Sequence, residues 1–233
     1  TKGGGHGDYR LLVLAPWSVQ EAADLVVDAF DLADYYRNPV MVMGDGLIGQ
    51  MMEPVEFTDR DEPLRPLTPK DWATSGCKGR APNIVNSLYL NPNALEQVNE
   101  RLQAKYREMA EKEVRFAEYG TDQDYDLLLC AYGTVARVCL TALEELEERG
   151  IHVGLFRPIS LYPYPYDQLR ERALRAKHVL VTELSAGQML EDVKLALHDK
   201  VPIHFHGRTG GNLISPEDVM RVAEGILGKG DGA

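Results

Sequence analysis

The chain has 233 residues, of which 44% are hydrophobic and 26% are charged, and its formal net charge is −11. This composition fits a globular protein with one large domain or two small ones, and the negative charge argues against a nucleic-acid partner. No apolar run approaches the length of a membrane span, so we expect no membrane contact and a cytoplasmic location. The three cysteines, Cys77, Cys130 and Cys139, indicate free thiols and form no iron–sulfur motif.

The first nine residues are rich in glycine and lack an initiator methionine. They are either a tag remnant or, in our preferred interpretation, a segment from inside a larger native protein. His6 and Asp8 in this segment are candidates for proton transfer or for contact with a cofactor or substrate. A histidine in a flexible loop could equally have neither role.

A strand–helix–strand unit follows this segment. Residues 10–15 have the apolar pattern of a strand, and Ser18 followed by Glu21 has the pattern of a helix capping box. Apolar residues at helical spacing extend to about residue 36, and residues 40–43 form a second strand. Two consecutive strands joined through a helix indicate a parallel sheet.

Residues 44–81 contain four prolines and little periodicity, which predicts an extended surface connector. Its first six residues match the G-x-G-x-x-G pattern of dinucleotide-binding loops. We reject nucleotide binding there, because Pro54 interrupts the required helix and Asp45 would place negative charge beside the phosphates. A single apolar stripe from residue 91 to about residue 118 predicts a long amphipathic helix after the connector.

The remaining residues, 122–228, alternate between strand and helix patterns. The predicted strands, which define a four-stranded parallel α/β domain, are residues 127–131, 153–156, 178–182 and 202–206. A loop rich in proline and tyrosine follows the second of these strands at the carboxyl edge of the sheet. Proteins of this class place functional or interface residues at that edge.

Three features of the C-terminal domain have competing interpretations. His204 and His206 share one face of a strand and could begin a metal site, but a strand-end pair is the favoured interpretation, and we predict no metal site. Arg208 lies beside a glycine-rich turn that could bind an anion, although a turn required by backbone geometry is favoured. Glu183 ends a strand, where it could orient a partner loop, remain solvated or cap a helix.

Residues 1–81 are predicted to be mainly an interface, because two strands cannot cover both faces of a parallel sheet. Trp17 and Met51 are the expected contacts in this segment, and Arg157 and Arg208 are those in the C-terminal domain. The alternative is that the segment folds back on the C-terminal domain and closes its own core.

Several motifs are specific in combination. They are KGGGHGDYR at residues 2–10, LAPWSVQE at 14–21, YRNPVM at 36–41, DGLIGQMMEP at 45–54 and GLFRP at 154–158, supported by NSLYL at 86–90, AGQM at 186–189 and HFHGR at 204–208. Together they resemble the α subunit of 2-oxoacid:ferredoxin oxidoreductases, most closely the 2-ketoisovalerate (3-methyl-2-oxobutanoate) type. The resemblance covers nearly the whole chain.

This resemblance implies an α/β fold in which an incomplete pyrimidine-binding domain of the thiamine-diphosphate type precedes a transketolase C-terminal-like αβα domain. The implied divisions are 1–45 for the end of the pyrimidine-binding domain, 46–121 for the connector with its helix, 122–228 for the C-terminal domain and 229–233 for a tail. The first half of the pyrimidine-binding domain, with the glutamate expected to activate the cofactor, is absent from this sequence.

The resemblance also implies an enzyme that decarboxylates a 2-oxoacid oxidatively with thiamine diphosphate and Mg²⁺, makes an acyl-CoA and reduces ferredoxin. The iron–sulfur clusters are expected on other subunits, and the expected partners are β-, γ- and δ-type subunits, with self-association as a further possibility. We expect this chain alone to be inactive and to bind no cofactor. The alternative is a non-catalytic scaffold or subunit-interaction module of the same fold.

Overall fold

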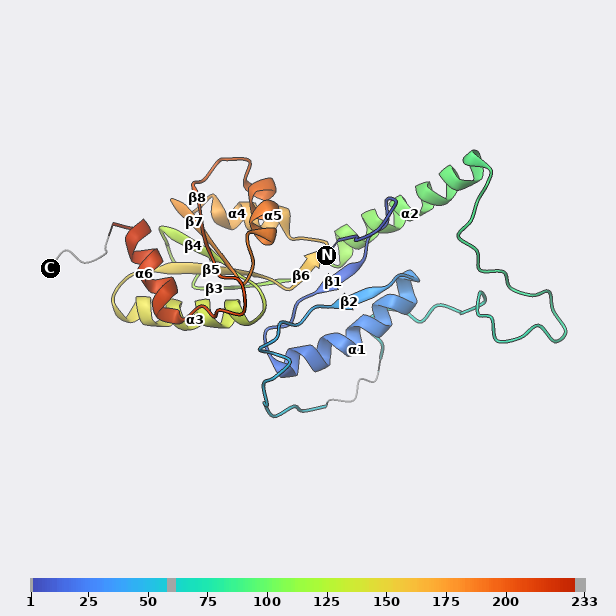
Figure 1. Ribbon diagram of the computed structural model, residues 1–233, viewed down its shortest axis with the longest axis horizontal. Helices are drawn as coiled ribbons and strands as arrows, with labels where there is room; N and C mark the ends of the chain where they lie inside the picture. The colour runs from blue at the N-terminus through green and yellow to red at the C-terminus, as the bar shows by residue number, and fades with distance from the viewer. Residues whose placement is uncertain (1, 58–61, 229–233) are drawn as a thin grey trace.

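The computed structural model describes residues 2–57 and 62–228. It contains two β-sheets with helices packed against them (Figure 1). The first sheet starts with the predicted strand–helix–strand unit, formed by β1 (Leu12–Leu14), α1 (Val19–Tyr36) and β2 (Val40–Val42). β1 and β2 are parallel, which confirms the prediction made from the helical connection.

Local sequence sets the start of α1. The Ser18 hydroxyl accepts a hydrogen bond from the Glu21 backbone N–H at 3.1 Å, as the capping pattern predicted. The Glu21 carboxylate accepts from the backbone N–H of Trp17 at 2.8 Å, one residue before the cap. Two backbone donors at the helix start are thereby satisfied.

A third strand, which the sequence did not reveal, completes the first sheet. β6 (Ser160–Tyr162) lies within the segment predicted to be a loop, and it pairs antiparallel with β1 to give the order β2-β1-β6. The Ala15 backbone N–H also donates to the Ile159 carbonyl at 2.7 Å. The C-terminal half of the chain therefore supplies one edge of the N-terminal sheet.

Both faces of β1, the central strand of this sheet, are covered by the chain's own residues. Leu12 and Leu14 are fully buried in a cluster that includes residues from α1 and from α2 (Pro92–Lys112). Val13 and Ala15 are equally buried on the opposite face, where Leu161 of β6 packs against them. β1 is therefore enclosed by residues of this chain, whereas Met41 on β2 is 37% exposed, and the interface role of residues 1–81 stays a prediction.

The helix predicted to run to about residue 118 ends at Lys112, and β3 (Phe116–Tyr119) follows it. Phe116 fits the helical stripe by spacing, but β3 pairs antiparallel with β5 (Val153–Pro158). The Phe116 ring stacks on Phe156 across these strands, with ring centroids 5.2 Å apart. Tertiary pairing therefore overrides the local helical pattern.

The second sheet has the order β3-β5-β4-β7-β8 and contains the four predicted parallel strands plus antiparallel β3. Its further elements are β4 (Leu127–Cys130), α3 (Gly133–Glu148), α4 (Tyr166–Ala173), β7 (His178–Glu183), α5 (Gln188–Leu197), β8 (Ile203–Gly207) and α6 (Pro216–Ile226). Helices α3 and α6 pack on one face, and α4 and α5 pack on the other. The predicted three-layer αβα arrangement is confirmed.

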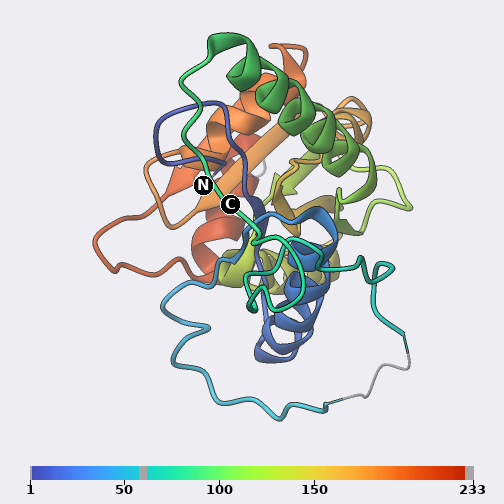
Figure 2. The same cartoon turned by 90° about the vertical axis from the view of Figure 1, so that its right-hand side faces the viewer.

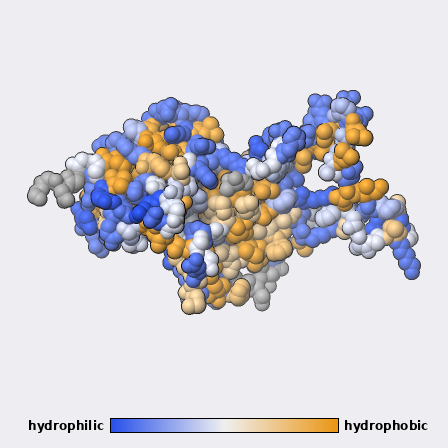
Figure 3. Space-filling model, viewed as in Figure 1, coloured by the Kyte–Doolittle hydropathy of each residue, from blue (hydrophilic) through white to orange (hydrophobic). Residues whose placement is uncertain are grey.

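The connector between β2 and α2 runs away from the rest of the molecule as a wide loop (Figures 1 and 2). Apolar side chains on it that are at least three-fifths exposed are Met52, Phe57, Leu67, Ile84, Val85, Leu88 and Leu90. Hydrophobic residues also gather on the surface over α1 (Figure 3), where Phe30 is 73% exposed. In the part of the chain that the structure describes, no helix is long and apolar enough to cross a membrane.

Candidate functional site

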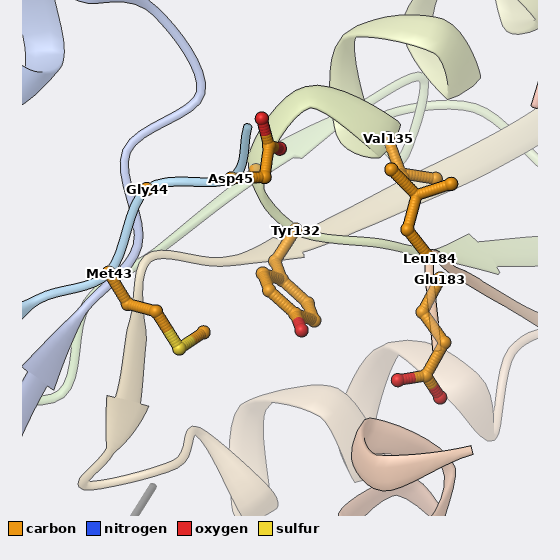
Figure 4. A pocket seen from close by; sticks show the side chains of 8 residues that line it. Met43, Gly44, Asp45, Tyr132, Val135, Glu183 and Leu184 are labelled. Atoms are coloured by element: carbon orange, nitrogen blue, oxygen red, sulfur yellow. The ribbon is translucent and has the colours of Figure 1, made fainter. Parts of the chain in front are cut away.

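A cavity of about 200 Å³ lies at the carboxyl edge of the second sheet. It is lined by Met43, Gly44, Asp45, Tyr132, Gly133, Val135, Glu183 and Leu184 (Figure 4). Residues 132–135 follow β4 and residues 183–184 end β7, and these neighbouring strands lead to β5 and β8 on opposite sides of the sheet. The cavity therefore lies at the topological switch point, where open α/β sheets bind ligands.

Asp45 closes the cavity from the start of the connector. Its carboxylate accepts from the backbone N–H of Thr134 at 3.0 Å and from the Thr134 hydroxyl at 2.9 Å. It also accepts from the backbone N–H groups of Leu47 and Ile48, both at 3.0 Å. Asp45 thus occupies the N-terminus of α3, where the partial positive charge of the helix favours an anion.

Gly133 makes this approach possible. Its φ is +58°, and a Cβ atom placed on it would lie 3.2 Å from the Asp45 carboxylate. Any other residue there would meet both backbone strain and a close contact. The glycine after β4 therefore lets the connector dock on α3.

Glu183 occupies the N-terminus of α5 in a similar way. It is 1% exposed, and its carboxylate accepts from the backbone N–H groups of Met189 at 3.1 Å and Leu190 at 3.2 Å. The Ser185 hydroxyl donates to the same carboxylate at 2.6 Å. Of the roles considered for Glu183, the geometry supports helix capping, and its burial excludes a solvated side chain.

Tyr132 projects between these two carboxyl groups (Figure 4). Burial, and then the negative charges of Glu183 and Asp45, raise the pKa of Tyr132 to about 12. The hydroxyl is therefore protonated at neutral pH and can donate or accept a hydrogen bond, but it cannot serve as a general base.

The G-x-G-x-x-G segment does not open a helix in this structure. Residues 46–50 form turns, and the Asp45 carboxylate fills the anion position at α3. The sequence had marked Asp45 only as an obstacle to phosphate. A carboxylate in a glycine-rich turn after a strand was the available signal for its role, but its partner, Thr134, is distant in the sequence.

His6 and Asp8 do not line this cavity. Both are exposed in the glycine-rich loop near the N-terminus. This loop is held at its start by Lys2, whose ammonium group pairs with Asp192 and donates to the Tyr166 hydroxyl at 2.8 Å. Contact of His6 and Asp8 with a cofactor or substrate remains a prediction.

Trp17 and Arg157, both predicted as interface residues, contact each other inside the chain. Arg157 is 1% exposed, and its guanidinium lies 4.1 Å from the centre of the Trp17 ring. It also forms an ion pair with Glu21, and Trp17 stacks on Tyr119 at a centroid distance of 5.4 Å. The structure corrects the location of Arg157, because its side chain joins the two sheets and presents no surface to another subunit.

Met51 and Arg208, the other two predicted interface residues, are differently placed. Met51 is half-buried, with its sulfur 3.6 Å from a guanidinium nitrogen of Arg137, and Arg137 pairs with Glu53 at 2.7 Å. Arg208 is exposed after β8. Their part in subunit contacts remains a prediction.

The remaining candidates form no metal centre within residues 2–57 and 62–228, where no group of three or more His, Cys, Asp or Glu side chains could hold an ion. The imidazole of His204 lies 3.2 Å from that of His178, on the neighbouring strand β7. Cys130 and Cys139 are fully buried, whereas Cys77 is exposed.

Two family models match the chain. The thiamine-diphosphate-binding domain of pyruvate flavodoxin/ferredoxin oxidoreductase matches residues 6–118, and core domain II of pyruvate:ferredoxin oxidoreductase matches residues 126–219. Ketoisovalerate oxidoreductase subunit VorB of Methanothermobacter marburgensis is 44% identical over 98% of this chain. The 2-oxoglutarate synthase subunit KorA of Methanocaldococcus jannaschii is 30% identical over 95% of it. The chain spans 64% of the VorB relative and 65% of the KorA relative.

Solved structures share the fold. The 2-oxoglutarate:ferredoxin oxidoreductase from Magnetococcus marinus, solved with 2-oxoglutarate, coenzyme A and succinyl-CoA bound, matches with a TM-score of 0.76 at 18% identity. The match covers 95% of this chain and 43% of that one. An inactive β4 tetramer of a split-gene transketolase matches with a TM-score of 0.53 at 15% identity, over 96% of this chain and 59% of the other.

Proposed function

The chain belongs to the 2-oxoacid:ferredoxin oxidoreductase family, and we propose that it is part of the α subunit of an enzyme that converts a branched-chain 2-oxoacid to its acyl-CoA. The observation that carries this proposal is the 44% identity to a ketoisovalerate oxidoreductase subunit over 98% of the chain. Identity to a 2-oxoglutarate synthase subunit is 30%, which favours the branched-chain substrate over 2-oxoglutarate.

Thiamine diphosphate would supply the electron sink for decarboxylation in such an enzyme. The described residues do not fit its diphosphate end, because Asp45 and Glu183 already occupy the N-termini of α3 and α5 at the functional edge of the sheet. These residues also form no carboxylate cluster for Mg²⁺. In this proposal a β subunit holds the diphosphate and Mg²⁺.

Electron transfer is likewise assigned to partner subunits. Two of the three cysteines are fully buried within separate elements, and burial raises the pKa of the Cys130 and Cys139 thiols to about 12. A cluster ligand must be an accessible thiolate. We therefore propose that γ- and δ-type subunits carry the iron–sulfur clusters and pass the electrons to ferredoxin.

The connector and the N-terminal loop are the proposed contacts with these partners. Ile84 and Leu90 are 84% and 87% exposed on an extended segment that stands away from the body, as partner-contacting segments often do. Met51 and Arg208 are also proposed to contact a partner subunit. His6 and Asp8, exposed in the glycine-rich loop, are proposed to face a cofactor or substrate held by the partner.

Reconstitution with β-, γ- and δ-type subunits tests this function. Because the resemblance places the cofactor-activating glutamate in a part of the α subunit that this sequence lacks, that part is also added to the mixture. With thiamine diphosphate, Mg²⁺, CoA and ferredoxin, the mixture should reduce ferredoxin faster with 3-methyl-2-oxobutanoate than with 2-oxoglutarate, and this chain alone should not. His6→Ala should lower turnover by about tenfold or more, whereas the exposed control His152→Ala should not. Equal turnover with this chain omitted would contradict the proposal and favour the scaffold interpretation.

A further inference from the structure

Helix α1 is apolar on two sides. Its inner side contributes Leu25 and Leu32 to the core of the first sheet. Its outer side carries Val26, Val27 and Phe30, which are 44%, 47% and 73% exposed. These three residues are three or four positions apart and form one stripe, where hydrophobic residues gather on the surface (Figure 3). A helix that is apolar on both sides is normally buried within a larger core.

Strand β2 is an open edge of the first sheet. In the part of the chain that the structure describes, β2 pairs with β1 and with no other strand. The backbone N–H of Met43 donates to the Leu14 carbonyl of β1 at 2.8 Å. Because N–H groups point alternately to the two sides of a strand, the N–H and C=O of Val42 point to the open edge. Such an edge can pair with a further strand.

One strand–helix unit can cover both the edge and the stripe. Helix α1 connects β1 to β2 and packs on one face of their sheet. A strand added beside β2, with its own helix on that face, places the new helix next to α1. Strands joined through helices run parallel, and sheets of this kind grow by such units. The first sheet has three strands, whereas sheets average about five or six.

The length of the relatives indicates where this unit comes from. The match to the VorB relative leaves more than a third of that protein unmatched, although it covers 98% of this chain. A second copy of this chain is a poorer occupant of the stripe. Helix α1 carries five acidic residues and no lysine or arginine, so two copies of it face to face would repel each other.

We propose that the part of the α subunit that this chain does not span docks on this surface. One of its strands pairs in parallel with the edge at Val42, and one of its helices covers Val26, Val27 and Phe30. The inference rests on the proposed assignment of the chain to an α subunit. It specifies where the rest of that subunit attaches, namely on the side of β2 away from β6.

Hydrogen exchange tests the strand pairing. The chain alone is compared with a fusion in which the unmatched part of the VorB relative is joined ahead of it. Exchange at residues 40–42 should slow at least about tenfold in the fusion, because the edge gains a partner. Residues 203–207 of β8, an open edge of the second sheet, are the control and should exchange equally in both proteins. No slowing at β2, or equal slowing at both edges, would overturn the proposal.

Variants of α1 test the helix contact. Phe30→Asp should leave the melting temperature of the chain alone unchanged, because Phe30 is exposed there, and should lower that of the fusion by about 5 °C. Leu195→Asp, which changes a leucine on α5 that is 55% exposed, is the matched control and should shift neither protein. Equal shifts for Phe30→Asp and Leu195→Asp in the fusion would refute the contact.

Two further results separate this inference from its alternatives. A parent chain that sediments as a dimer, with Phe30→Asp monomeric, would assign the stripe to a second copy and overturn the proposal. The enzymatic function is measured separately by ferredoxin reduction. A fusion that shows the expected protection at residues 40–42 but supports no turnover would contradict the proposed function and leave this docking surface in place.

Discussion

The two sheets of this protein are assembled from sequence in different ways. Four of the five strands in the larger sheet come from one continuous stretch of alternating strands and helices. The smaller sheet combines β1 and β2 from the N-terminal end with β6 from the middle of the C-terminal domain. The larger sheet can form through contacts between residues that are close in the sequence, whereas the smaller sheet requires two distant segments to meet.

The side chains between the two sheets show how that meeting is stabilised. Arginines between residues 115 and 157 pair with acids between residues 21 and 53, as Arg157 does with Glu21, Arg115 with Asp28 and Arg137 with Glu53. The hydrogen bonds from Thr134 to Asp45 add a polar contact between the connector and α3. These contacts indicate that the smaller sheet is stable only when it is docked on the larger one.

Truncation of a core leucine in each sheet should produce the largest difference. Leu129 and Leu14 are both fully buried, so each change to alanine should cost about 3 kcal/mol locally. Leu129→Ala should lower the midpoint of the whole urea transition. Leu14→Ala should instead open the smaller sheet first, seen as faster hydrogen exchange at residues 12–15 and 160–162. Identical hydrogen-exchange patterns in the two variants would show that the smaller sheet does not open separately from the larger one.

Arg157→Met tests the docking contact with the next largest effect. The change leaves Glu21 without its cation and removes the contact with Trp17, so it should destabilise the docked sheet by about 2 kcal/mol. Arg149→Met removes an exposed arginine that pairs with Glu224 and should cost less than about 0.5 kcal/mol. Urea unfolding followed by Trp17 and Trp72 fluorescence measures both. Equal losses of unfolding free energy in the two variants would show that the buried Arg157–Glu21 pair stabilises the protein no more than the exposed pair does.

Asp45→Ala should have a smaller effect of about 1 kcal/mol, because α3 loses its cap and the connector loses its anchor. Asp45→Asn retains an acceptor and should recover part of that loss. Asp71→Ala, in an exposed part of the connector, is the control. Thermal unfolding measures all three, and an Asp45→Ala variant as stable as the control would show that the cap is unimportant.

The smallest expected effect is a change of stability with alkaline pH. Burial raises the pKa of Cys139 from 9.0 to about 12, so the folded state retains a proton that the unfolded state releases. This contribution is fully present below about pH 9 and is lost as the pH rises from about 9 towards 12. Cys139→Ala should therefore lose less stability than the parent between about pH 8 and pH 10. An unchanged pH dependence would contradict the assignment.

The sequence predicted what local pattern determines. The apolar run before Gly133, the cap at Ser18 and the strand–helix alternation after residue 122 all led to the observed elements. The family resemblance added the two domain types and the oxidoreductase interpretation, which residue chemistry alone did not supply. Both depended on motifs that are continuous in the sequence.

What could not be predicted depends on contacts between distant residues. β6 has three residues between proline-rich neighbours, and only pairing with β1 makes it a strand. Phe116 fits a helix by spacing, but pairing of β3 with β5 places it in a strand. The cavity was missed for the same reason, because Asp45, Tyr132 and Glu183 converge only after both sheets have formed.

Cleavage of the connector tests most directly whether the smaller sheet is held by the larger one. Trypsin should cut at the exposed Lys78 and Arg80 without unfolding either sheet. If the account is correct, the two fragments should remain associated and elute together in native gel filtration at the volume of the intact 26.0 kDa chain, separating only in denaturant. Fragments that separate under native conditions, with the larger sheet still folded, would contradict it.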